Sequence, residues 1–225
     1  MTTEAPPSST ELDLAAIRQQ LGTAVLSDAL DGLGLRRQCL GSGLAPLERD
    51  QVIAGYAFPV VIERMTSVPD RPFRGLVAAL DEIEPDEVFI TPTSRARDIA
   101  VWGELLSTAC QRRGAAGAIT DGLIRDTRAI RRLGFPVVSA GTIPYDSMGR
   151  HEIVDHRVPG MIDDVSIEPG DLVVADSDGV VVVPRAVASA VVQAALTKRA
   201  SEHEFRSAVA GGMAATEAFA TFGVL

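Results

Sequence analysis

Segments typical of helices and strands alternate between residues 72 and 139, and this alternation restricts the possible folds more than any other feature of the sequence. Two of the helical segments stop at Gly114 and Gly134, and glycine is the residue most often found just past a helix C-terminus. Such alternation is typical of βαβ units, in which helices pack on a largely parallel sheet. The spacing predicts helices around 76–83, at 103–113 and at 127–133, and strands at 88–90, 116–120 and 135–139.

The segment before this region is expected to add two helices and a strand. Thr10 and Asp13 form a possible capping box, after which Leu14 and Ile17 follow helical spacing as far as Gly22. The other elements expected here are a helix over 23–33 and a strand over 55–62.

After residue 150 the pattern changes from alternating to β-rich. Residues 158–183 contain β-branched runs separated by the turns Pro169-Gly170-Asp171 and Asp176–Gly179, with no helical pattern. A long helix over 186–209 follows, Gly211-Gly212 interrupts it, and a short helix ends the chain. We therefore expect an α/β protein, a compact sandwich with a largely parallel sheet and helices plus a β-rich second layer.

The tail and the domain boundaries follow from composition. Residues 1–10 are polar and contain two adjacent prolines, so we expect a disordered tail. The rest of the 225-residue chain, 11–225, is expected to form a single domain. Because no secretory pattern or long apolar run is present, we expect a cytoplasmic protein without a membrane span.

Charge and cysteine content exclude several classes of function. The chain has 21 basic and 30 acidic residues, a net charge of −9, which disfavours binding to nucleic acid or to anionic lipid. Cys39 and Cys110 are far apart and have no neighbouring histidine pair, so neither a zinc site nor a disulfide is expected.

The densest group of chemically useful residues falls at two expected helix starts, 103–106 and 122–126. In a parallel sheet both lie beyond the carboxyl ends of strands, the edge at which open α/β sheets bind ligands. Free backbone N–H groups at the first helix start can bind a carboxylate or phosphate, and Arg125 adds a two-pronged donor. Asp126 and Glu104 contribute hard oxygens, which suit Mg²⁺ or Mn²⁺. The backbone donors expected to hold the ligand belong to Gly103, Glu104, Leu105 and Leu106.

Each of these residues also has a purely structural interpretation. Asp126 can be a helix cap, and Glu104 can be favoured in a first turn by the helix dipole. Arg125 can simply pair with Asp121 or Glu104 at the surface.

The combination of Glu104, twenty intervening residues and then Arg125-Asp126 resembles the signature of the RraA-like family. That family includes the divalent-metal 4-hydroxy-4-methyl-2-oxoglutarate/4-carboxy-4-hydroxy-2-oxoadipate aldolases. The resemblance extends over most of the chain. Its segments are Ser27–Asp31, Trp102–Leu106, Asp121–Asp126, Leu133–Val137, Pro169–Asp171 and Asp178–Pro184.

The resemblance implies a ring-shaped trimer, sometimes doubled to a hexamer, with active sites between subunits. It implies Asp126 as the direct metal ligand, Glu104 as holder of metal-bound water and Arg125 beside the substrate. A glutamate of the neighbouring subunit's C-terminal helix, Glu202 or Glu204, would also act through water. The aldolase pattern has aspartate where this chain has Glu104, whose side chain is one methylene longer.

These groups suit cleavage of a 4-hydroxy-2-oxo acid to pyruvate. A Mg²⁺ or Mn²⁺ ion stabilises the developing enolate as a Lewis acid, and Arg125 adds electrostatic stabilisation. Loss of CO₂ from oxaloacetate gives the same enolate, so oxaloacetate decarboxylase activity is expected as well. Schiff-base chemistry is disfavoured because the single lysine, Lys198, lies on a polar helix.

Two other functions are associated with proteins of this family, and the sequence favours them differently. RraA itself inhibits ribonuclease E, so a non-catalytic regulator is the alternative, although such a role would not need Arg125-Asp126. A methyltransferase is disfavoured because Gly41-Ser42-Gly43 lacks the strand-to-helix context of a nucleotide-binding loop.

The loops 93–98 and 141–150 do not indicate which substituent the substrate carries on C4. Within the second loop, Tyr145, Asp146 and Ser147 form a polar segment near the same edge.

Overall fold

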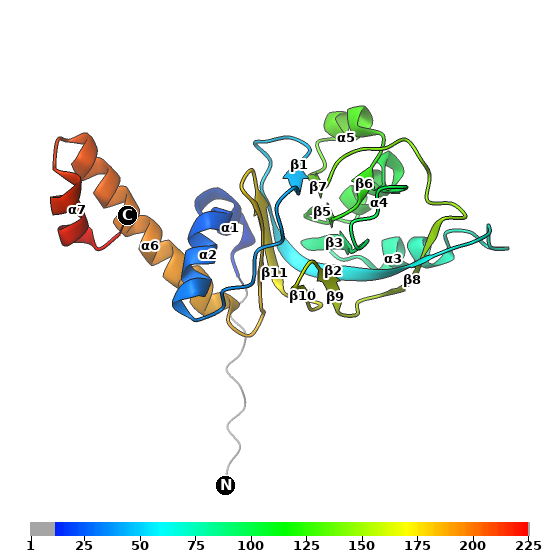
Figure 1. The fold of residues 1–225 in the computed structure, drawn as a ribbon, viewed down its shortest axis with the longest axis horizontal. Coiled ribbons are helices and arrows are strands. Elements are labelled where there is room, and N and C mark those ends of the chain that lie inside the picture. The colour runs from blue at the N-terminus through cyan, green and yellow to red at the C-terminus, as the bar shows by residue number, and fades with distance from the viewer. Residues whose placement is uncertain (1–11, 225) are drawn as a thin grey trace, which may run out of the picture.

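The computed structural model describes residues 12–224 and has a mixed β-sheet at its centre (Figure 1). The strands are β1 (Ala45–Pro46), β2 (Ile53–Arg64), β3 (Glu87–Thr91), β4 (Ala100–Trp102), β5 (Gly117–Thr120), β6 (Leu123–Ile124), β7 (Val137–Ser139), β8 (His151–His156), β9 (Gly160–Ile162), β10 (Val165–Ile167), β11 (Leu172–Asp176) and β12 (Gly179–Val183). Their main sheet has the order β1-β7-β5-β3-β2-β11-β12, and β8 pairs with the far end of β2. The four central strands are parallel and the others antiparallel.

The helices cover the outer face of this sheet in two groups. They are α1 (Leu14–Gln20), α2 (Thr23–Gly32), α3 (Arg74–Glu82), α4 (Glu104–Arg112), α5 (Thr127–Leu133), α6 (Ala188–Ala210) and α7 (Ala215–Phe222). The first group, α1, α2 and the start of α6, packs on β11 and β12. The second, α3 to α5, packs on β2, β3, β5 and β7.

Alternation along the strands divides the core between the two faces. Val88 and Ile90 point into an inner aliphatic cluster, whereas Phe89 between them packs under the helices. Val173 and Val174 are divided in the same way. Successive strand residues point to opposite faces of the sheet, and both faces here are covered. The sequences of these strands are therefore continuously apolar.

The α/β class expected from the alternation is confirmed. The β-rich segment, however, does not form a layer of its own: β11 and β12 join the main sheet next to β2, and only β9 and β10 form a separate hairpin. The sheet also gains β8, which lies in a segment not expected to be a strand. Antiparallel partners for β2 are long-range pairings, which local sequence patterns do not specify.

The start of α1 also differs from expectation. Asp13 is itself the cap, and its Oδ1 accepts a hydrogen bond of 2.9 Å from the backbone N–H of Ala16. Thr10, like the tail expected over 1–10, lies outside the described residues.

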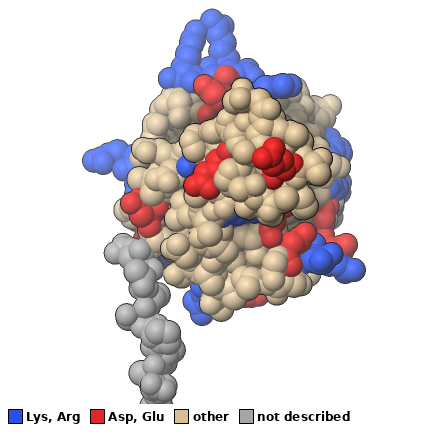
Figure 2. Space-filling view, turned by 90° about the vertical axis from the view of Figure 1, so that its left-hand side faces the viewer, with Lys and Arg blue, Asp and Glu red and all other residues tan. Residues whose placement is uncertain are grey.

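Helices α6 and α7 form an arm that extends away from the sheet, on the side opposite to α4 and α5 (Figure 1). Only the first half of α6 is buried, through Ala188, Val191 and Ala195. The face of the molecule on that side is mostly uncharged toward its centre, with a few acidic side chains there and basic side chains at its rim (Figure 2). Within residues 12–224, none of the helices has the length and apolar character needed to cross a bilayer.

Candidate functional site

Two short parallel strands, β4 and β6, bring the two expected helix starts together. Trp102 is paired with Ile124, and the backbone N–H of Arg125 donates to the carbonyl of Trp102 at 2.9 Å. Because the strands are parallel, the residues that follow them leave at the same edge. Gly103 and the first turn of α4 therefore lie beside Arg125 and Asp126, more than twenty residues later in the chain.

The first turn of α4 is held by a buried network. The indole N–H of Trp102 donates to Ser107 Oγ at 2.8 Å, and that hydroxyl donates to the carbonyl of Gly103 at 3.1 Å. The carboxylate of Glu104 accepts from Thr108 Oγ1 at 2.9 Å, one turn further along the helix. The N–H groups of Leu105 and Leu106 have no intrahelical acceptor because they belong to the first turn, so they can bind an anion.

Asp126 occupies the cap position of α5 but its side chain does not cap that helix. Its backbone is left-handed, with φ of 57°, and its Oδ2 instead lies 3.4 Å from the backbone nitrogen of Glu104 in α4. A Cβ on Gly103 would approach this oxygen to 2.8 Å, so only glycine leaves room for the carboxylate here. The capping interpretation of Asp126 is therefore wrong for α5.

Arg125 lies between two carboxylates. Its Nε is 3.7 Å from Asp126 Oδ2, and its Nη2 is 3.5 Å from Asp146 Oδ1, which comes from the loop after β7. The surface pairing considered for Arg125, with Asp121 or Glu104, is not found among the described residues. Asp146 is the site residue whose role the sequence does not predict. Its position after a third parallel strand indicates that it lies at the same edge of the sheet. No local pattern, however, indicates that it pairs with Arg125.

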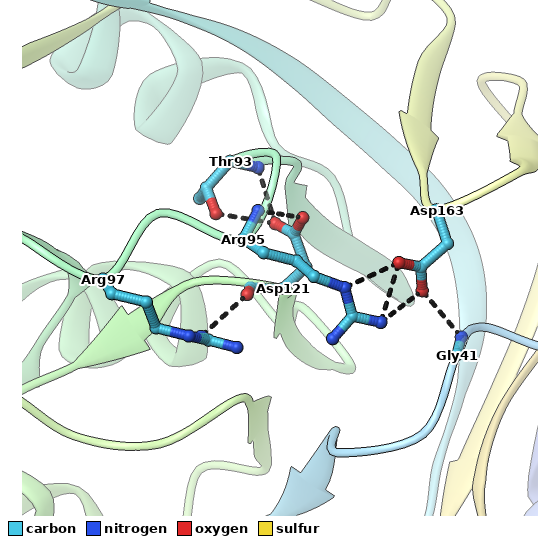
Figure 3. Close-up of polar contacts among 6 residues, drawn as sticks. All are labelled: Gly41, Thr93, Arg95, Arg97, Asp121 and Asp163. Atoms are coloured by element: carbon cyan, nitrogen blue, oxygen red, sulfur yellow. Dashed lines mark hydrogen bonds and ion pairs between the residues drawn. The ribbon is translucent and has the colours of Figure 1, made fainter.

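Asp121 is buried and serves a different purpose (Figure 3). Its carboxylate accepts from the backbone N–H and hydroxyl of Thr93 at 2.6 and 2.8 Å, and from the N–H of Arg95 at 2.8 Å. Arg95 in turn makes a bidentate pair with Asp163, at 2.7 and 2.8 Å, which lowers the pKa of that carboxyl. The loop 93–98 is therefore fixed at the same edge as the site.

The donor set at Asp126 fits a divalent cation of the magnesium type. Its carboxylate is half-exposed, and Oδ1 has no hydrogen bond within the described chain. No three histidine, cysteine, aspartate or glutamate side chains form a ligand cluster within residues 12–224. Mg²⁺ does not need such a cluster, because it keeps several waters and is commonly held by one or two carboxylates.

The other two expected metal-site residues, Glu202 and Glu204, are not brought to Asp126 within one chain. Both lie in the second half of α6, in the arm that points away from α4 and α5 (Figure 1). Within one chain, both residues therefore lie on the side of the molecule opposite to α4 and α5 (Figure 1).

The fold and site together define an α/β protein that presents one guanidinium, two neighbouring carboxylates and a free helix start at the carboxyl edge of its parallel strands. Similar proteins are known. The family model described as RraA-like, Aldolase/RraA, matches residues 23–182. The chain therefore belongs to the RraA-like family.

Individual relatives cover nearly the whole chain. A protein of Halalkalibacterium halodurans named "Putative 4-hydroxy-4-methyl-2-oxoglutarate aldolase" is 31% identical over 212 residues, 94% of this chain and 96% of that protein. The crystal structure of Streptomyces coelicolor RraAS2, described as an unusual member of the RNase ES inhibitor RraA protein family, has a TM-score of 0.76 at 32% identity, covering 86% of this chain and 94% of that chain. An uncharacterized Pseudomonas syringae protein has a TM-score of 0.81 at 30% identity, covering 91% and 95%.

Proposed function

We propose that this chain is a cytoplasmic, divalent-metal-dependent lyase that cleaves a 4-hydroxy-2-oxo acid to pyruvate. The observation that carries the proposal is the meeting of Arg125 and Asp126 with the first turn of α4 across β4 and β6. The aldolase name of a relative aligned over 94% of the chain supports it.

In this reaction the bond between C3 and C4 breaks and its electron pair becomes the enolate of pyruvate. The C4 hydroxyl loses its proton and becomes a carbonyl, and the enolate takes up a proton at C3. The backbone N–H groups of Leu105 and Leu106 bind the carboxylate of the 2-oxo acid. Arg125 donates to the C2 oxygen, where negative charge grows, so its contact strengthens toward the transition state.

Asp126 is the residue that would hold Mg²⁺ or Mn²⁺ directly, with Glu104 contacting it through water. The ion would supply Lewis-acid stabilisation of the enolate. The carboxylate of Glu104, which accepts a hydrogen bond from Thr108 Oγ1 on its own helix, would take the place of the aspartate of the aldolase pattern. Decarboxylation of oxaloacetate, which gives the same enolate, is expected as a second activity of the same groups.

We also propose that the site is completed in a homotrimer or hexamer by Glu202 or Glu204 of a neighbouring subunit. The position of both residues in an arm that leaves its own site is consistent with donation to another copy.

A screen of 4-hydroxy-2-oxo acids and oxaloacetate for pyruvate release tests the function. We expect pyruvate with Mg²⁺ or Mn²⁺, loss of the activity with EDTA, and recovery when metal is restored. Asp126→Asn should fold, because asparagine tolerates the left-handed backbone, but lose metal-dependent turnover because an amide is a weaker ligand for a hard cation. An unchanged rate in EDTA would show that the metal mechanism is wrong.

The alternative is a protein regulator of ribonuclease E, supported by the likeness to RraAS2. The acidic chain, with net charge −9, can attract a basic partner. Inhibition of purified ribonuclease E by both the parent and Asp126→Asn, with no pyruvate from any substrate, would favour this function.

A further inference from the structure

Two edges of the Arg125 guanidinium face carboxylates as ion pairs, which leaves one edge for a ligand. Nε faces Asp126 at 3.7 Å and Nη2 faces Asp146 at 3.5 Å. No hydrogen bond in the described chain involves Nη1. Because the guanidinium is planar and its donors form a rigid fork, orienting two of its nitrogens toward these carboxylates also orients the third.

The two carboxylates are not equivalent partners for Arg125. Asp126 is the proposed cation ligand, and a carboxylate bound to a divalent cation attracts a guanidinium less strongly because its charge is shared. Asp146 comes from a different segment, the loop after β7, and its Oδ1 also accepts from the backbone N–H of Met148 at 3.4 Å. It can keep its contact with Nη2 when Asp126 binds a cation.

Asp146 is itself held in place by its loop. The carbonyl of Tyr145 accepts from the N–H of Ala100 in β4 at 3.1 Å, and Arg150 donates to the carbonyl of Asp146 at 2.9 Å. The Arg150 guanidinium carbon also lies 5.3 Å from the centre of the Tyr145 ring. The loop is therefore hydrogen-bonded to β4, the strand that leads into α4. Asp146 and the first turn of α4 are thus both positioned by β4.

We propose that Asp146 is a positioning residue for Arg125: it holds Nη2 so that Nη1 points at an oxygen of the bound 2-oxo acid. The identity of this ligand rests on the proposed function. The Arg125 side chain is long and about one-third exposed, so an anchor that orders it before binding reduces the entropy lost on binding. Misplacing a catalytic donor by about 1 Å can cost about a hundredfold in rate.

The test compares three variants. Asp146→Asn removes the charge with little change in shape, and Asp146→Glu keeps the charge. Asp86→Asn is the matched control, because it breaks another partly exposed Arg–Asp pair, with Arg18 at 2.7 Å, in the turn before β3 and away from the site. Turnover is measured over a range of Mg²⁺ concentrations.

Binding of oxalate, a stable mimic of the pyruvate enolate, gives a second readout that does not require turnover. It is followed with Mg²⁺ present by the fluorescence of Trp102, the single tryptophan of the chain, whose carbonyl accepts the N–H of Arg125.

We expect Asp146→Asn to lower kcat by about tenfold or more and to weaken oxalate binding, without changing the Mg²⁺ concentration that gives half-maximal rate. Asp146→Glu should recover part of the loss, and Asp86→Asn should match the parent. In an Arg125→Lys background, Asp146→Asn should add less than about twofold, because its effect passes through Arg125.

Parental kcat and oxalate affinity in Asp146→Asn would overturn the proposal. So would full additivity with Arg125→Lys, or an equal loss in Asp86→Asn. A parent that binds oxalate but releases no pyruvate would refute the proposed reaction and leave the oxalate comparison to decide the role of Asp146. A parent that does not bind oxalate would overturn the positioning role too, because no anion would then meet Arg125.

Discussion

Arg125 is separated from Asp121 by only three residues, yet the two side chains serve different structures. Asp121 is buried and holds the loop 93–98, whereas Arg125 stands partly exposed between Asp126 and Asp146. Arg125 therefore pairs with the adjacent Asp126 and with the distant Asp146, but not with Asp121 four positions earlier. Substitutions of single residues separate the roles.

Arg125→Lys keeps the positive charge but removes the planar fork. If Arg125 stabilises the enolate oxygen, kcat should fall by about a hundredfold, the effect of losing one transition-state donor, while the Mg²⁺ requirement stays that of the parent. Steady-state kinetics with a metal titration measures both. Arg128→Lys, an exposed change in the adjacent helix, is the control, and parental kcat in Arg125→Lys would refute the catalytic role.

Gly103→Ala tests the close approach of the carboxylate to α4. The new Cβ would lie 2.8 Å from Asp126 Oδ2, so the carboxylate must move. Since the displaced group is the end of a side chain, the free energy of unfolding should fall by only about 1 kcal/mol or less. Turnover should fall by about tenfold or more because Asp126 is misplaced. Urea unfolding and pyruvate release check the two parts.

The control for this change is Gly32→Ala at the end of α2. Nothing lies within 4 Å of a Cβ at that position, and alanine favours a helix over glycine by up to about 1 kcal/mol. The control should therefore keep its activity and be no less stable than the parent. Equal activity in Gly103→Ala and Gly32→Ala would contradict the proposed place of Asp126 in the site.

Among the secondary-structure elements, the two short strands β4 and β6 do the most to form the site. Their pairing sets the start of α4 beside the start of α5. The loop after β3 is fixed at the same edge by Asp121 from one side and, through Arg95, by the turn between β9 and β10 from the other (Figure 3). We expect this second attachment, through Arg95 and Asp163, to depend on pH.

Hydrogen bonds from Arg95, and then from the N–H of Gly41, lower the pKa of Asp163 in the folded protein. The folded state therefore binds fewer protons than the unfolded state around and below about pH 4, the usual range of an aspartate. The contribution of Asp163 to stability is present above that pH and is lost as pH falls through the folded pKa. Asp163→Asn should be less stable than the parent at pH 6, and the difference should shrink toward pH 3.

Urea unfolding at the two pH values measures this effect. Asp164→Asn, a change of the exposed neighbour in the same turn, should show no such pH-dependent difference. A constant gap between Asp163→Asn and the parent from pH 6 to pH 3 would show that the ion pair does not account for the stabilisation.

In the molecule as a whole, the arm of α6 and α7 stands out because it leaves apolar side chains exposed and carries two glutamates away from the site. Its outer half is largely exposed, with Phe219 at 52% exposure and Val209 at 36%. Glu202 and Glu204 lie on this arm and away from Asp126 of the same chain (Figure 1). A site shared between copies would explain both features.

Mixing two inactive variants tests such sharing. Glu202→Gln or Glu204→Gln, whichever is inactive, is co-expressed with Asp126→Asn. If a glutamate from one subunit completes the site of another, mixed assemblies contain some intact sites and regain part of the parental activity. Light scattering should show a trimer or hexamer. A monomer at micromolar concentration, or no recovery on mixing, would exclude the shared site.

Local sequence patterns are sufficient to predict the α/β class, most helix and strand positions, and the group Glu104, Arg125 and Asp126. The patterns are hydrophobic periodicity, glycine after helices, and two helix starts that follow parallel strands. Neighbouring parallel strands end at one edge of a sheet, so the residues that follow them are expected to lie together from their order in the chain.

The remaining features depend on tertiary contacts. Long-range packing joined β11 and β12 to β2, turned the Asp126 carboxylate toward α4 instead of capping α5, and placed Asp146 against Arg125. These contacts link segments 20 or more residues apart, and their free energy depends on packing and on competing partners for each charge. No local pattern carries that information, because the same aspartate can cap, pair or bind a cation according to what the fold brings beside it.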